Sequence, residues 1–217
     1  MPRRARSPNW DPNPNEYAGC AIAARSSTVW VAGDFSRIGG ASREGPAALD
    51  AETGTALAWN PAPNGSVEAF ALGPDSLYTA GSFNSVGGQR RRGLAEVDLV
   101  TSAPTSFGAT TNLSVTVGGC CGLEKSVVLR LVDSILFVGA YGSFNGVRRN
   151  GLAALDAETG ALLDWSPHFL GSRTGAASQV LGLGVGIRAE NHRVDRVDEP
   201  HHACLERIVG GLGKGLP

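Results

Sequence analysis

The residues best suited to covalent chemistry are two adjacent cysteines, Cys120 and Cys121, which are flanked by Gly119 and Gly122. A cysteine reacts as its thiolate, so reactivity needs a basic or dipolar setting, and Lys125 is the basic residue nearest in sequence. Two interpretations stay open: a disulfide between the two neighbours that shapes a ligand-facing loop, or two reduced thiols in a tolerated insertion. The sparse basic environment favours the second interpretation.

A second group of potential ligands lies near the C-terminus, in a segment that contains His192, His201, His202 and Cys204. Structural zinc sites usually pair their ligands at C-x₂₋₄-C or H-x₃₋₅-H intervals, and these residues have neither interval. The two adjacent histidine side chains would also point apart on any regular element. We therefore expect a solvated helix start here and no bound metal.

Oxygen-bearing side chains alternate with prolines in residues 11–16, which gives the segment some likeness to a calcium loop. Calcium takes six to eight oxygen ligands and its loops need a turn glycine. The prolines instead stiffen the chain into an extended connector. Residues 60–65 carry a degraded form of the pattern, and both segments are predicted to be linkers between strands.

Signatures of catalysis are absent from the sequence. It contains no G-x-S-x-G nucleophile elbow, and residues 210–215 lack the Ser or Thr that a phosphate-binding loop places after its lysine. The glycines in residues 182–186 do not have dinucleotide-binding spacing. The sequence therefore supports neither an enzyme nor a cofactor.

The elements that must position all these residues follow from an internal repeat. The pattern R-x-G-[PL]-A-[AE]-[LV]-D occurs three times, and its aspartates are Asp50, Asp98 and Asp156. The arginines that open the three copies are Arg43, Arg91 and Arg149. The aspartates are 48 and 58 residues apart, near the roughly 40 to 50 residues of a propeller blade.

Each unit is predicted to contain four short strands, three of them near residues 67–72, 77–81 and 93–98 and the fourth near 55–59 of the preceding copy. The second and third strands are apolar on both faces, which suits burial between neighbouring sheets. In the turn that follows, aspartate can accept backbone N–H bonds and glycine tolerates positive φ. Because Ser102 replaces that glycine in the second copy, we expect a looser or differently shaped hairpin there.

With these motifs, the chain resembles bacterial β-propeller repeat proteins of the kelch-like and quinoprotein-like type, whose units read roughly V-x-G-G-x-F, G-L-A-A-L-D-x-x-T-G and W-x-P. The likeness covers about residues 10–167. It implies an all-β propeller of four-stranded antiparallel blades, with three recognisable blades and partial strands at each end, so that the ring is incomplete or the chain is a fragment. It also implies a scaffold role within a larger surface or secreted protein.

The predicted organisation starts with a disordered tail at residues 1–8. Blades then occupy about residues 18–60, 66–108 and 126–167 within 9–171, and a degenerate last blade or irregular, helical tail covers 172–217. A net charge of −1 on 217 residues gives no reason to expect nucleic acid as a partner. No window approaches the roughly 20 apolar residues of a membrane-spanning helix, so membrane insertion is not expected. No export signal is visible, and four cysteines leave the redox compartment open.

Two functions are compatible with this pattern. The first is a non-enzymatic scaffold or interaction module whose loops, especially residues 109–125, contact a protein or a carbohydrate. The second is a ligand-binding or catalytic propeller with a site in its central channel, where the recurring arginines could hold an anion. Small residues on the predicted inner strands favour the first function: Ala21, Ala23, Ala69 and Ala71.

Residues that recur once in every unit usually serve the unit itself, so the three arginines are expected to bond carbonyl groups within or between blades. The same logic applies to the tryptophans, whose rings are expected to pack between blades with each indole N–H on a backbone partner. These residues are Trp10, Trp59 and Trp165, and the second copy has no tryptophan.

Overall fold

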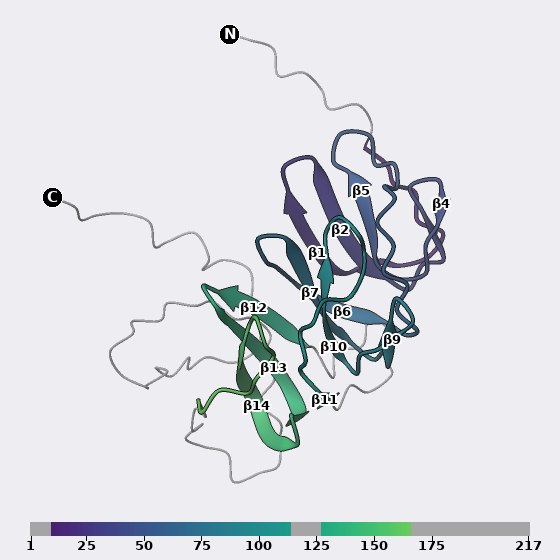
Figure 1. Ribbon diagram of the computed structural model, residues 1–217. Helices are drawn as coiled ribbons and strands as arrows, with labels where there is room; N and C mark the ends of the chain where they lie inside the picture. The colour runs from purple at the N-terminus through teal and green to yellow at the C-terminus, as the bar shows by residue number, and fades with distance from the viewer. Residues whose placement is uncertain (1–9, 114–126, 166–217) are drawn as a thin grey trace, which may run out of the picture.

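The computed structural model describes residues 10–113 and 127–165, which form strands, turns and loops without a helix (Figure 1). The predicted all-β fold class is therefore confirmed for the described residues. Their strands form several separate antiparallel sheets, and none of these sheets closes on itself.

Three larger sheets follow one another along the chain. The first contains β1 (Ala18–Arg25), β2 (Thr28–Gly33) and β5 (Ala47–Asp50). The second contains β6 (Val67–Leu72), β7 (Ser76–Gly81) and β10 (Leu94–Asp98). The third contains β11 (Thr111–Leu113), β12 (Val128–Val132), β13 (Ile135–Phe144) and β14 (Val147–Asp156). We call the segments 18–60, 67–108 and 111–165 units 1, 2 and 3.

Two small hairpins connect the second and third strands of the first two units. In unit 1, β3 (Arg37–Ile38) pairs with β4 (Ala41–Ser42). In unit 2, β8 (Ser85–Val86) pairs with β9 (Gln89–Arg90). In unit 3, β13 and β14 continue as one long hairpin instead.

The predicted fourth strand is reduced to a single antiparallel bridge in each unit. The bridged pairs are Leu49 with Ala56, Val97 with Pro104 and Leu155 with Leu162. This segment lies at the outer edge of its sheet with one neighbour only, and in unit 2 the proline has no N–H to donate. The outer segment therefore adds side chains to the unit more than it adds ladder hydrogen bonds.

The first strand of every unit is irregular at the same place. The register shifts between Ala18 and Ala21 in β1 and between Val67 and Ala69 in β6. In unit 3, β11 pairs with the end of β13 and β12 with its beginning, and residues 114–126 lie between the two. The extra residues of unit 3 thus enter where the other units have a bulge, a common point for an insertion because pairing is already interrupted there.

The two largest hydrophobic clusters lie between units. The cluster between units 1 and 2 includes Trp30, Trp59, Leu77 and Val97. The cluster between units 2 and 3 includes Tyr78, Phe107, Leu136 and Leu155. All six residues of β7 are buried, because a neighbouring unit covers each of its faces. Since each large apolar side chain contributes about 1.5–3 kcal/mol when buried, the units stabilise one another chiefly through these faces.

The first strands of the three units lie next to one another. β6 packs against β1 on one side and against β12 on the other (Figure 1). Ala69 and Ala71 of β6 are buried, and Ala21 and Ala23 of β1 are half-buried. The small side chains allow these inner strands to approach closely.

The prediction of a differently shaped hairpin at Ser102 is wrong. Ser102 has φ 64°, close to the 74° of Gly54 and the 75° of Gly160 at the equivalent positions. Its N–H donates to the Asp98 carbonyl at 3.1 Å, as that of Gly54 does to Asp50 at 2.9 Å. A hydrogen bond from the Asn60 N–H to the Ser102 hydroxyl, at 2.9 Å, helps to offset the cost of the left-handed backbone.

Candidate functional site

The three recurring aspartates close the turns that follow the third strands, and we call them the turn aspartates. In unit 1, Asp50 Oδ1 accepts hydrogen bonds from the N–H and the hydroxyl of Thr53, both at 2.8 Å. Thr101 and Thr159 make the same pair of contacts with Asp98 and Asp156. These donors lower the pKa of each turn aspartate, because they stabilise the carboxylate form.

The recurring arginines tie the connection before the third strand to the outer segment of the same unit. Arg43 donates from Nη2 to the Leu57 carbonyl at 2.7 Å and from Nη1 to the Ser42 carbonyl at 2.8 Å. In unit 2, Arg91 donates from Nη2 to the Thr105 carbonyl at 2.6 Å and from Nη1 to the Arg90 carbonyl at 2.9 Å. Both guanidinium groups therefore bond the backbone of their own unit.

Tryptophan side chains link one unit to the next. The Trp59 indole N–H donates to the Asp98 carbonyl of unit 2 at 3.0 Å, and the Trp10 indole N–H donates to the Asp50 carbonyl of unit 1 at 3.2 Å. Trp165 packs edge-on against Phe137 of its own unit, with ring centroids 5.3 Å apart.

Unit 2 has an aromatic residue at the tryptophan position after all, and sequence reasoning missed it. Phe107 follows Asp98 by nine residues, the interval that separates Asp50 from Trp59. Its ring packs edge-on against Tyr78 with centroids 5.5 Å apart, the arrangement seen for Trp165 on Phe137. The constant nine-residue interval was the signal that could have identified it.

Unit 2 has a polar side chain, near its contact with unit 3, at a position where the other two units have alanine. Glu96 stands where units 1 and 3 have Ala48 and Ala154, and it accepts hydrogen bonds from Ser76 at 2.6 Å and from the Thr105 hydroxyl. The Tyr78 hydroxyl donates across to the Ala157 carbonyl of unit 3 at 2.8 Å. Burial, reinforced by the Glu96 carboxylate, raises the pKa of Tyr78, so the phenol stays protonated and able to donate.

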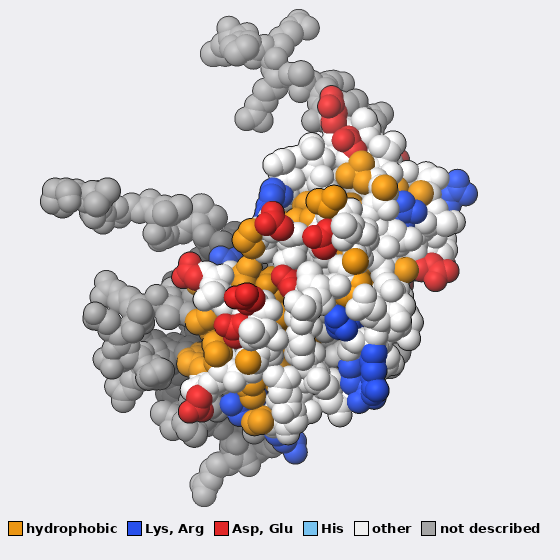
Figure 2. All heavy atoms as spheres, viewed as in Figure 1, with side chains coloured by type: hydrophobic (Ala, Val, Ile, Leu, Met, Phe, Trp, Pro, Cys, Tyr) orange, Lys and Arg blue, Asp and Glu red, His pale blue; other side chains and the backbone are white. Residues whose placement is uncertain are grey.

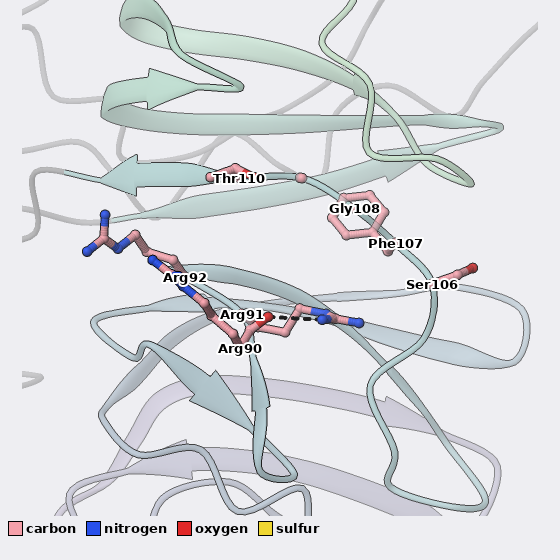
Figure 3. A pocket seen from close by; sticks show the side chains of 8 residues that line it. Arg90, Arg91, Arg92, Ser106, Phe107, Gly108 and Thr110 are labelled. Carbon is pink, nitrogen blue, oxygen red and sulfur yellow. Dashed lines mark hydrogen bonds between the residues drawn. The ribbon is translucent and has the colours of Figure 1, made fainter.

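A depression of about 400 Å³ opens beside unit 2, between residues 90–92 and residues 106–110 (Figure 3). Arg91 extends toward Ser106 and Phe107, whereas Arg90 and Arg92 extend toward the end of the depression at which Thr110 lies, as alternation along an extended chain requires (Figure 3). Arg92 Nε lies 3.5 Å from Asn84 Oδ1, and Arg90 has no side-chain partner within residues 10–113 and 127–165. The described lining residues of the depression include three arginines and no carboxylate.

Charge is unevenly distributed between the two ends of the sheets. The turns at one end carry mostly acidic residues, namely Asp50, Glu52, Asp75, Asp98, Asp133, Asp156 and Glu158. At the other end, the connection between β7 and β10 and the first residues of β14 carry arginines without an acidic residue. Figure 2 shows the densest group of Lys and Arg side chains over the part of the surface around β9.

Glu68 lies in the bulge of β6, at the same end of the sheets as the connection between β7 and β10, and it is half-buried. Burial, with a smaller contribution from the Asp34 carboxylate, raises the pKa of Glu68 to about 7. Among the described residues, no group of three or more His, Cys, Asp or Glu side chains is arranged to hold a metal ion. Glu68 is therefore a titratable group without the partners that a cation site requires.

The oxygen-rich segment at residues 11–16 uses its side chains to hold the backbone. Asn15 Oδ1 accepts the N–H groups of Ser36 and Arg37 at 3.1 and 2.8 Å, and Asn64 Oδ1 accepts those of Asn84 and Ser85 at 2.8 and 2.9 Å. Both asparagines thereby fix the start of a hairpin in their own unit. Sequence reasoning placed them in linkers but did not assign this clamping role.

Several sequence-derived candidates lie outside the described residues. These are Gly119, Cys120, Cys121 and Gly122, and the C-terminal His192, His201, His202 and Cys204. Cys20, at the bulge of β1, is disulfide-bonded.

Only part of the predicted contact loop 109–125 lies within the described residues. Residues 111–113 form β11, which pairs with β13, and Ala109 and Thr111 are buried. The Thr111 hydroxyl also donates to the Arg92 carbonyl at 2.5 Å. Residues 111–113 are therefore a strand and not a loop, and a contact between this segment and a partner stays a prediction.

No protein-family model matches this chain, and none of the curated proteins is similar enough to count as a relative. Within the described residues, no helix is long and apolar enough to cross a membrane. The functional argument therefore depends on the contacts of the chain itself.

Proposed function

We propose that this chain is a non-enzymatic β-propeller segment that acts as a rigid scaffold or interaction module. Three properties support a propeller arrangement: each unit ends in an outer bridged segment, the units bury their broad faces against one another, and their first strands are adjacent. A stack of this kind leaves the loops at both ends of the sheets free to contact a partner.

The observation that carries the proposal is the use of the recurring side chains inside the fold. The arginines of units 1 and 2 bond carbonyl groups, the turn aspartates bond threonines, and Trp59 bonds the neighbouring unit. A channel site would instead require several units to direct such groups at one point. The small residues on β1 and β6 further favour a packed axis over a ligand-binding channel.

The arginine contacts give a direct test. Arg43→Gln removes a charged donor from the Ser42 and Leu57 carbonyls, and we expect the free energy of unfolding to fall by about 1.5–3 kcal/mol. The matched control is Arg37→Gln, which removes the same charge from an exposed position on β3. The control should change stability by less than about 0.5 kcal/mol.

Urea unfolding followed by tryptophan fluorescence measures both variants. A structural role requires the Arg43 variant to be clearly less stable than the Arg37 variant. If the two variants are equally stable, Arg43 does not hold its unit together and the scaffold proposal loses its main support.

A further inference from the structure

The second unit departs from the first at a set of positions that gather around one depression. Each residue of unit 2 has a counterpart 48 positions earlier, as the shared contacts of Arg43 and Arg91 show. Along the hairpin edge, Ser42 and Glu44 of unit 1 become Arg90 and Arg92. Two positions that carry a neutral and a negative side chain in unit 1 are therefore both positive in unit 2.

The opposite wall changes as well. At the end of unit 1 and the start of the linker after it, the chain has Trp59, Asn60 and Pro61; the positions 48 residues later have the smaller Phe107, Gly108 and Ala109. Read from the sequence, these changes suggest a decaying repeat. In space they line the same depression of about 400 Å³. Departures from a local pattern that converge on one place are typical of a functional site.

The depression has positive charge that no carboxylate among its described lining residues neutralises. Arg91 is half-buried and its hydrogen bonds go to neutral oxygen atoms, those of Arg90, Thr105 and Gln89. Arg90 is exposed, and the side chain of Arg92, also exposed, contacts the uncharged amide of Asn84. Three cationic side chains at consecutive positions, without a carboxylate in the lining, create a local field that attracts anions.

The available donors define the ligand chemistry. The N–H groups of Gly108 and Thr110 are already bonded to Thr159 and to Asn145. With respect to residues 10–113 and 127–165, the donors left without a partner are the guanidinium forks of Arg90 and Arg92, and hydroxyl groups also line the depression. Guanidinium forks match the oxygen spacing of phosphate and sulfate and bind them bidentately.

We propose that this depression binds a phosphate or sulfate ester, with Arg90 and Arg92 as its anion-binding residues and Arg91 as a fixed neighbouring charge. The volume of about 400 Å³ leaves room for the group that carries the ester, since small-molecule sites span roughly 300–1,000 Å³. The ester can belong to a small molecule or to a sulfated polysaccharide, because both present the same oxyanion. The site extends the proposed interaction module and rests on that proposal for the packing that holds unit 2 in place.

The repeat itself supplies the test variant. Arg90→Ser with Arg92→Glu installs in unit 2 the residues that unit 1 carries in the same backbone setting, so the variant is expected to fold. The matched control, Arg148→Ser with Arg37→Glu, lowers the net charge by the same three units at exposed positions outside the depression. Circular dichroism and thermal melts establish that both proteins are folded.

Isothermal titration calorimetry with the full chain then compares glucose 6-phosphate with glucose, and dextran sulfate with neutral dextran, at fixed salt. We expect wild type to bind at least one of the charged probes and neither neutral one, with a Kd below about 1 mM. The Arg90/Arg92 variant should weaken binding at least tenfold and the control less than twofold. The charged probe that binds distinguishes a small ester from a polymer.

Two results would overturn the site. Wild type that binds neither charged probe shows that the depression takes no such ester. Equal losses in the two variants show that only net charge attracts the probe. Neither result affects the scaffold proposal, which fails only if the Arg43 and Arg37 variants are equally stable.

Discussion

Gly160 gives a sharp test of how units 2 and 3 are joined. It has φ 75° in the turn after β14, and a Cβ built there would lie 2.4 Å from Ala109 N and 3.0 Å from Ala109 Cα. Ala109 belongs to the linker that follows unit 2. Alanine at position 160 must therefore push the turn of unit 3 away from that linker, whose Gly108 N–H bonds the Thr159 carbonyl at 3.1 Å.

The magnitude follows from two destabilising contributions and one stabilising contribution. The left-handed backbone costs a non-glycine residue about 1–2 kcal/mol, and overpacking against backbone adds about 1–3 kcal/mol. Alanine also lowers the conformational entropy of the unfolded chain, which stabilises the folded state by about 0.4–1 kcal/mol. We expect Gly160→Ala to lower the free energy of unfolding by about 2–4 kcal/mol.

Gly146→Ala is the matched control, because Gly146 has φ 82° but no atom within 4 Å of its built Cβ. It carries the backbone cost alone, so a loss of about 1 kcal/mol is expected. Urea unfolding at neutral pH measures both variants. If Gly160→Ala is no more destabilising than Gly146→Ala, the turn does not contact the linker. This result would contradict the packing of unit 3 against the end of unit 2.

Three further predictions concern titratable and bonded groups. The pKa of each turn aspartate is lower in the folded chain than the ordinary 3.8, so stability should decline as pH falls below about 4, and Asp98→Asn should reduce that decline in urea unfolding between pH 2 and 7. Glu68 has a folded pKa of about 7 against an ordinary 4.5, so the folded chain binds more protons between these values and stability falls as pH rises through them. Glu68→Gln should then be more stable than wild type by about 1 kcal/mol at pH 8, after allowance for solvent screening, and equal at pH 4. Tyr78→Phe removes the hydrogen bond to the Ala157 carbonyl and should cost about 1–2 kcal/mol in thermal unfolding, whereas no change would mean that this bond is not made.

The strands were predictable because their apolar residues carry the signal. Residues 67–72 are β6 as predicted, and the buried second strands follow from runs that are apolar on both faces. The outer segment was not predictable as a bridge, because the sequence does not show that it lacks a second neighbour. Ser102 was misjudged because a hydroxyl bond to a residue 42 positions away stabilises its turn.

The depression in unit 2 could not be predicted from the sequence for a similar reason. Unit 2 has Phe107 where unit 1 has Trp59, and Arg90 where unit 1 has Ser42. These two differences are 17 residues apart in the sequence of unit 2. Only the fold shows that they share one surface. Sequence reasoning considered the recurring arginines as an anion site, whereas Arg43 and Arg91 bond carbonyl groups in the structure and Arg90 and Arg92 are exposed.

Hydrogen exchange of the indole N–H groups, followed by NMR, tests the stacking of the units most directly. Trp59 is buried and donates to the Asp98 carbonyl of the next unit, whereas Trp10 makes the equivalent bond while 38% exposed. The Trp59 indole proton should exchange only on global unfolding, and that of Trp10 much faster. Equally fast exchange of the two protons would show that unit 1 is not seated on unit 2 and would contradict the stacked arrangement.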